Sequence, residues 1–113
     1  MIGRWLIAFV FTQLVEVPLY ARALRGDRRP LLATLAIAFG ASAITHPVVW
    51  FVFPRVVDGF WLRLVLSEVF AVLAEAAYFT ACTKMPRPLL VAFAVNMTSV
   101  SLGFASRAAF GVP

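Results

Sequence analysis

Four long apolar stretches, separated by short segments that carry charge, proline or glycine, constrain this chain more than any other feature. They run over residues 5–24, 31–53, 60–82 and 89–110. Each is close to the roughly 20 residues that a helix needs to cross the hydrocarbon core of a bilayer. Strands of a membrane β-barrel would be about 10 residues long with alternating polarity, and nothing in this sequence alternates in that way. We predict an all-α fold, a four-helix transmembrane bundle that forms a single membrane domain over residues 1–113.

The composition excludes an ordinary soluble domain. Of the 113 residues, 63% are hydrophobic and 13% are charged, against roughly 45–50% and about 25% in soluble proteins. A soluble chain of this size would have to expose large apolar patches. The net charge of +5 does not indicate nucleic acid, because the basic residues do not form one solvated face. Membrane lipid is the expected surrounding.

The distribution of basic residues predicts the orientation. Six of them lie at the first and third connections: Arg22, Arg25, Arg28, Arg29, Lys84 and Arg87. Connections rich in Lys and Arg stay on the cytoplasmic side. We therefore predict a multi-pass protein of the bacterial cytoplasmic (inner) membrane with both termini outside. Three tryptophans then lie near the outer interface, where indole rings are favoured: Trp5, Trp50 and Trp61.

The N-terminal stretch imitates a signal peptide, because Arg4 precedes an apolar run and Ala21-Arg22-Ala23 resembles a cleavage site. A retained first span fits the sequence better, because the apolar run contains Glu16 and Pro18 and is followed by several arginines. We expect the segment to be retained.

The two halves of the chain resemble each other. V-F-T-Q-L-V-E-V-P-L-Y at 10–20 is similar to V-F-A-V-L-A-E-A-A-Y at 69–78, and an R-P-L-L segment follows in each half, at 29–32 and 87–90. Two crossings per copy would relate the halves by an axis along the membrane normal. We predict a two-fold pseudo-repeat of a helical hairpin, with Glu16 and Glu75 at matching positions. Chance similarity between leucine- and alanine-rich helices is the alternative.

Four ionisable residues fall deep inside the predicted spans, namely Glu16, His46, Glu68 and Glu75. A charged side chain at the bilayer centre costs about 2.5–3.5 kcal/mol on insertion scales, so each needs a partner, a proton or a role. At a rise of 1.5 Å per residue, His46 and Glu68 lie about 10–12 Å from the outer end, Glu16 about 17 Å and Glu75 about 22 Å. We predict an outer His46–Glu68 layer and a mid-membrane Glu16–Glu75 layer.

Helical spacing suggests a polar seam around these residues. Glu68, Glu75, Phe79 and Cys82 form one stripe of the third span, with Cys82 as a packing residue. On the second span, small residues at helical spacing are expected to let backbones approach: Ala33, Ala36, Gly40 and Ala43. The supporting polar residues are Thr12, Gln13, Tyr20, Tyr78, Asn96 and Ser99.

The functional interpretation of the seam is a site for a cation or proton, with Glu16, Glu75, Glu68 and His46 as ligands. Two carboxylates that share a site cannot easily both ionise, so without a bound cation one of Glu16 and Glu75 would be neutral. A metal cation is the one cofactor that these residues suggest. Pro47 after His46 predicts a kink whose free carbonyls could join a ligand shell. In the alternative, protonated glutamates and a neutral histidine only join helices, at about 0.6 kcal/mol per contact.

These residues leave three function classes. The first is a protein that binds or conducts a cation or proton, as a component of a homo-oligomer or a larger membrane complex. The second is a structural accessory subunit or assembly factor whose seam docks the helix of a partner. An intramembrane enzyme is disfavoured, because the sequence has no HExxH, GxSxG or Gly-rich phosphate loop and no visible pair of nucleophile and base.

Three short motifs carry a resemblance to known sequences: E-V-P at 16–18, T-H-P-V-V-W at 45–50 and S-E-V-F-A-V-L-A-E-A-A-Y at 67–78. The pattern resembles small four-span bacterial integral membrane proteins of unknown function, in which Asn often replaces the histidine. The resemblance implies the four-span topology and singles out Glu16, Glu68 and Glu75. The replacement by Asn implies a polar or carboxylate site rather than an obligatory imidazole ligand.

Overall fold

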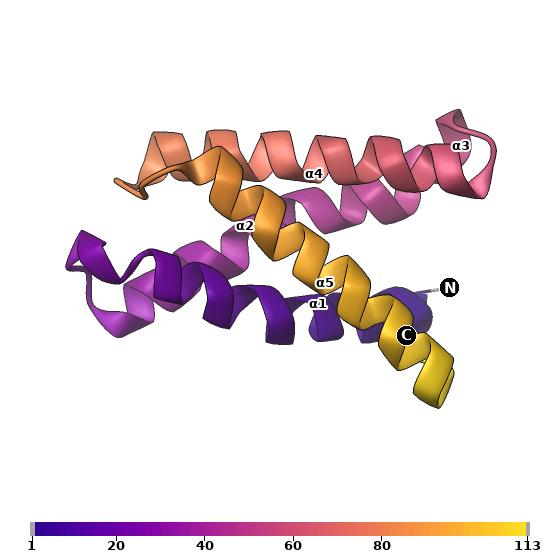
Figure 1. Cartoon of the computed structure of the whole chain (residues 1–113), viewed down its shortest axis with the longest axis horizontal. Helices are drawn as coiled ribbons and strands as arrows, with labels where there is room; N and C mark the ends of the chain where they lie inside the picture. Colours follow the sequence, from indigo (N-terminus) through magenta and orange to yellow (C-terminus); the bar gives the residue numbers. More distant parts are fainter. Residues whose placement is uncertain (1, 113) are drawn as a thin grey trace.

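The computed structural model describes residues 2–112 and contains four long helices. These are α1 (Ile2–Ala23), α2 (Leu31–Phe51), α4 (Phe60–Cys82) and α5 (Pro88–Phe110), with a 3₁₀ turn η1 (Arg25–Asp27) and a short helix α3 (Phe53–Val56) between them (Figure 1). All four long helices, α2 with its extension through α3, are long and apolar enough to cross a membrane. The all-α four-span prediction is therefore confirmed, and the helix boundaries lie within three residues of those predicted.

Proline and glycine set several of these boundaries. Pro30 precedes α2, and Pro88 occupies the first turn of α5, where its missing N–H leaves no intrahelical bond unmade. Gly111 ends α5 at φ 75°, a left-handed conformation that glycine adopts without strain. Pro47, in contrast, lies inside α2, which continues through it to Phe51.

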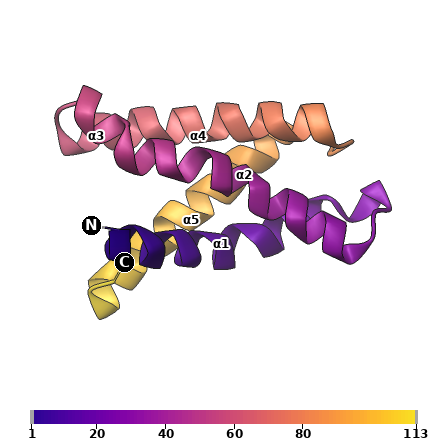
Figure 2. The same ribbon diagram turned by 180° about the vertical axis from the view of Figure 1, so that it is seen from behind.

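The four long helices form a ring around a common centre. α1 packs against α2 and α5, and α4 packs against the same two helices, so α1 and α4 face each other across the bundle (Figures 1 and 2). The start of α1, the end of α5 and α3 lie at one end, called the terminal end below. The two basic connections, 24–30 and 83–87, lie at the other, called the arginine end (Figure 1).

The interior differs between the two ends. Towards the arginine end it is filled by a compact apolar cluster, made of Tyr20, Leu24, Ala38, Ala41, Phe79, Met85 and Val95. The rings of Tyr20 and Phe79 are both fully buried, and their centroids are 4.4 Å apart. Towards the terminal end the interior contains a cavity of about 240 Å³. The apolar cluster therefore holds the helices together on one side of the cavity.

α2 and α4 approach closely at Gly40. A Cβ atom at this position would lie 2.5 Å from the hydroxyl oxygen of Tyr78. That hydroxyl donates a hydrogen bond of 2.8 Å to the carbonyl oxygen of Ile37, one turn earlier on α2. The lack of a side chain at residue 40 thus allows the Tyr78 ring to reach the backbone of α2.

Two predictions about helix faces were wrong. Cys82, expected to pack in the interior, is exposed at the end of α4. The inward face of α2 is not the stripe of small residues, on which Ala36 is exposed. It consists instead of Thr34, Ala38, Ala41, Ser42 and Thr45.

Candidate functional site

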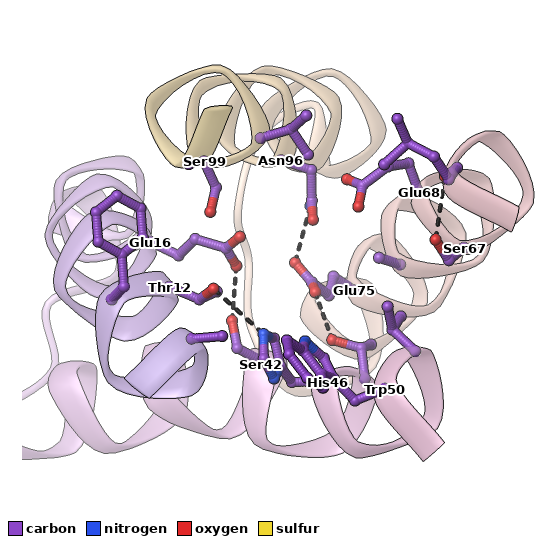
Figure 3. A pocket seen from close by; sticks show the side chains of 18 residues that line it. Thr12, Glu16, Ser42, His46, Trp50, Ser67, Glu68, Glu75, Asn96 and Ser99 are labelled. Atoms are coloured by element: carbon purple, nitrogen blue, oxygen red, sulfur yellow. Dashed lines mark hydrogen bonds between the residues drawn. The ribbon is translucent and has the colours of Figure 1, made fainter. Parts of the chain in front are cut away.

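The cavity at the terminal end is bounded by all four long helices, and its polar side chains point into it (Figure 3). All four ionisable residues singled out by sequence line this one cavity: Glu16 on α1, His46 on α2, and Glu68 and Glu75 on α4. The structure therefore brings together residues that are up to 59 positions apart in the sequence.

Glu75 is the most connected polar residue of the bundle. Its Oε1 accepts hydrogen bonds from the Tyr20 hydroxyl at 2.5 Å and from the Asn96 amide at 3.0 Å. Its Oε2 accepts one from the Thr45 hydroxyl at 2.7 Å. These donors come from α1, α5 and α2, and the side chain is only 1% exposed. One carboxylate, which accepts on both oxygens, thus joins four helices.

Glu16 lies across the cavity from Glu75. Ser42 on α2 donates a hydrogen bond of 2.6 Å to its Oε1, and the hydroxyl of Ser99 on α5 points toward the same carboxylate (Figure 3). The side chain is 3% exposed. Figure 3 shows the carboxylates of Glu16 and Glu75 directed toward each other across the centre of the cavity.

Neither of these buried carboxylates has a basic partner among the described residues 2–112. Within residues 2–112 the only ion pair joins Arg29 and Asp27, which lie at the arginine end. Hydroxyl and amide groups are the only hydrogen-bond donors to Glu16 and Glu75 in that part of the chain. The cavity wall is therefore acidic, and the described lining residues include no Lys or Arg to balance it.

His46 and Glu68 share the cavity but are not joined by a hydrogen bond in the described structure. Nε2 of His46 lies 3.3 Å from the Thr12 hydroxyl, and its Nδ1 is buried without a partner among residues 2–112. Its ring stacks on Trp50, with centroids 6.2 Å apart. Glu68 is half-buried and also borders an apolar groove of about 360 Å³ between α4 and α5. The two residues of the predicted outer layer therefore line the same cavity, but they do not form a hydrogen-bonded pair in the described structure.

The cavity does not have the form of a closed metal centre. No group of three or more His, Cys, Asp or Glu side chains in the described chain is placed to hold one metal ion. Both oxygens of Glu75 are already occupied by protein donors. The four candidate ligands contribute charge and polarity to a shared space instead of converging on one point.

Four of the six supporting polar residues lie at the site. Thr12, Asn96 and Ser99 line the cavity, and Tyr20 bonds to Glu75 from just beyond it. The other two serve the backbone of α2. The Gln13 amide donates to the carbonyl oxygen of Phe39 at 3.2 Å, and the Tyr78 hydroxyl bonds at Ile37.

The sequence reasoning missed two residues of α2, Ser42 and Thr45, each of which donates to one of the buried glutamates. Their spacing relative to Thr34 could have identified them, because positions i, i+8 and i+11 fall on one face of a helix. In an otherwise apolar span, that polar face indicates the interior.

Fold and cavity together define the class of this chain, a four-span integral membrane protein with a buried acidic cavity. Comparison with known proteins found no matching family, no matching curated protein and no matching solved structure.

Proposed function

We propose that this membrane protein binds a cation or a proton in the cavity, at Glu16 and Glu75. The observation that carries the proposal is two carboxylates, 3% and 1% exposed, that face one cavity without a basic side chain in the described structure. Uncompensated charge at this depth is too costly to persist. Each carboxylate must therefore hold a proton or share an external cation.

The volume of the cavity favours a binding site over simple attachment between helices. A water molecule occupies about 30 Å³ of liquid, so a cavity of about 240 Å³ has the volume of several waters. Hydrogen bonds that only fasten helices need no such space. The side chains of both glutamates also point into the bundle. This orientation favours a role in binding a ligand over a role in docking the helix of a partner protein.

The arrangement of the glutamates supports duplication of a hairpin. Glu16 accepts from Ser42, and Glu75 accepts from Asn96. In each case the glutamate is on the first helix of its hairpin and the donor is on the second. We infer that the halves are copies and that the ligand lies between them, as in transporters with parallel repeats.

We further propose that the terminal end faces outward from a bacterial inner membrane and that the arginine end is cytoplasmic. The clustering of Arg and Lys in the connections at the arginine end supports this orientation. Because one bundle of four helices encloses only a small cavity, we also propose that the protein works as a homo-oligomer or within a larger membrane complex.

The experiment that tests the binding proposal is a thermal unfolding series in detergent. The purified protein is titrated with Na⁺, K⁺, Mg²⁺, Ca²⁺, Zn²⁺ and ethylammonium, and the number of protons taken up or released on binding is measured in weakly buffered solution. A ligand present at 100 times its Kd should stabilise the fold by about 2.7 kcal/mol. Glu16→Gln and Glu75→Gln should remove the stabilisation.

Asp58→Asn is the matched control, because it removes the same charge from an exposed acid at the terminal end. It should leave the stabilisation unchanged. Absence of any ligand-dependent stabilisation and of any proton exchange that depends on Glu16 or Glu75 would refute the proposed function.

A further inference from the structure

An apolar groove adjoins the acidic cavity on the side where α4 and α5 pack together. Its volume is about 360 Å³, and Glu68 is the one residue of its lining that is not apolar. Val65, Val69 and Phe93 in its walls are each at least half exposed. The groove therefore opens on the outer surface of the bundle, which faces lipid when the protein lies in a membrane.

Glu68 lies at the junction between the groove and the cavity. It lines both spaces, together with Leu64 and Val100, and Figure 3 shows its carboxylate pointing toward the cavity. Unlike Glu16 and Glu75, it accepts no hydrogen bond from another side chain within residues 2–112. A carboxylate without a protein donor is thus available to a ligand where the polar and the apolar space meet.

We infer that the cavity and the groove together form one site for a cationic amphiphile, an amine that carries an alkyl chain. The ammonium group lies among the carboxylates of the cavity, and the chain passes Glu68 and lies in the groove between α4 and α5. This inference rests on the proposed function and specifies its ligand class.

The charge of the lining selects the head group of the amphiphile. Three carboxylates line the cavity, and none of the described residues that line the cavity or the groove is Lys or Arg. An anionic head group would be repelled there. A phospholipid such as phosphatidylethanolamine carries a phosphate between its ammonium group and its chains, and this phosphate would lie near Glu68 without a basic partner. A simple amine has no such anionic group.

The groove explains why the ligand carries a chain. A small inorganic cation would use the cavity alone and would leave the groove without a role. An amine dissolved in the bilayer can approach the cavity from the side, because the groove opens where its chain already lies. Each methylene group that leaves water for apolar surroundings should tighten binding by up to about fourfold.

The test compares ethylammonium with octylammonium in nanodiscs of phosphatidylcholine. Calorimetry gives Kd relative to the free aqueous concentration, and empty nanodiscs provide the reference for partition into lipid. Octylammonium should bind at least about tenfold more tightly than ethylammonium, because its longer chain leaves water. Octane-1-sulfonate has the same chain and the opposite charge, and it should not bind to the protein.

Variants of the groove show where the chain lies. Val65→Phe and Val69→Phe each place an aromatic ring in the groove and should weaken octylammonium binding at least about tenfold, which corresponds to about two methylene groups. Ethylammonium binding should not change, because the cavity is intact. Val10→Phe is the matched control, since it makes the same substitution at an exposed position of α1 outside the groove.

A variant of the junction shows where the ammonium group lies. A chain in the groove keeps the ammonium group near Glu68, whereas ethylammonium can move to the other two glutamates. Glu68→Gln should therefore weaken octylammonium binding about tenfold, the scale of one charge-assisted hydrogen bond. The same variant should have a smaller effect on ethylammonium.

The outcomes separate this inference from the proposed function. If octylammonium binds no more tightly than ethylammonium, or if the groove variants and Val10→Phe affect it equally, the amphiphile assignment is wrong and cation binding stands. If neither the amines nor any metal cation binds, both proposals fail. If phosphatidylethanolamine added to the nanodiscs displaces octylammonium, and does so only while Glu68 is present, the occupant is a lipid head group and the assignment to a simple amine is wrong.

Discussion

The phenolic hydroxyl of Tyr20 on α1 donates a hydrogen bond of 2.5 Å to the carboxylate of Glu75 on α4. These helices lie opposite each other in the bundle and do not pack together directly in the described structure. Because Glu75 also accepts from α2 and α5, this bond completes a junction between all four long helices.

The junction predicts measurable coupling between its two members. Tyr20→Phe removes one donor and Glu75→Gln removes one acceptor, so each should lower the free energy of unfolding by about 1 kcal/mol. The double variant should lose less free energy of unfolding than the sum of the two single losses. The difference, which is the coupling energy, should be about 0.6–1.7 kcal/mol, the range found between membrane helices. Unfolding in mixed micelles by steric trapping measures both values. Strictly additive losses would mean that the bond contributes nothing.

The close approach at Gly40 predicts a rescue experiment. In Gly40→Ala the new methyl group would lie 2.5 Å from the Tyr78 hydroxyl, so the ring must move and lose its bond to the backbone of α2. We expect a loss of about 1 kcal/mol. In a Tyr78→Phe background the oxygen is absent and the nearest remaining ring atom is 3.4 Å away. The same alanine should then be nearly neutral, and an equal loss in both backgrounds would contradict this explanation.

Arg29 connects the two basic turns at the arginine end. Its Nε donates to Asp27 at 2.7 Å, and its guanidinium also donates to the carbonyl oxygen of Cys82 at 2.8 Å. Arg29→Lys cannot reproduce the planar pair of donors and should lower thermal stability by less than about 1 kcal/mol, since the site is exposed. Arg28→Lys, a neighbouring exposed position, is the control and should have no effect. Equal thermal stability of Arg29→Lys and Arg28→Lys would mean that the hydrogen bond from Arg29 to the carbonyl oxygen of Cys82 does not contribute to stability.

The single cysteine makes the proposed orientation directly testable. In a Cys82→Ser background, Gly26→Cys places a thiol at the arginine end, where no heavy atom lies within 4 Å of the new Cβ position. Asp58→Cys places one at the terminal end. A membrane-impermeant maleimide should label residue 58 in intact spheroplasts and residue 26 only after permeabilisation. The reverse pattern would invert the topology.

The fold and the burial of the two candidate glutamates were predictable because bilayer physics leaves few alternatives. The length of the apolar stretches determines where the spans lie. The free-energy cost of a charge in lipid directs Glu16 and Glu75 into the bundle, regardless of how the other side chains pack. Both are buried on one cavity. A single strong penalty thus decides these positions.

The face of α2 that points into the bundle could not be predicted from the cost of a charge in lipid. The span from residue 31 to 51 is nearly uniform in hydropathy, and small residues occur on several of its faces. Ser and Thr in a membrane helix can bond to their own backbone, as Thr45 does at Ala41, so they need not face inward. Only the position of the glutamates on other helices selects the face that holds Ser42.

The error at Cys82 has a geometric cause. Glu68, Glu75 and Cys82 follow each other at intervals of seven, and an ideal helix turns by about 20° for each such interval. A stripe centred on Glu75, which is fully buried, therefore drifts off the interior in both directions. Glu68 is half-buried and Cys82 is exposed.

The packed rings of Tyr20 and Phe79 close the acidic cavity towards the arginine end. The apolar cluster around these rings fills the arginine half of the bundle, so a path along the bundle axis from the cavity ends at this cluster. In this conformation, vectorial passage through the bundle would require the two rings to separate.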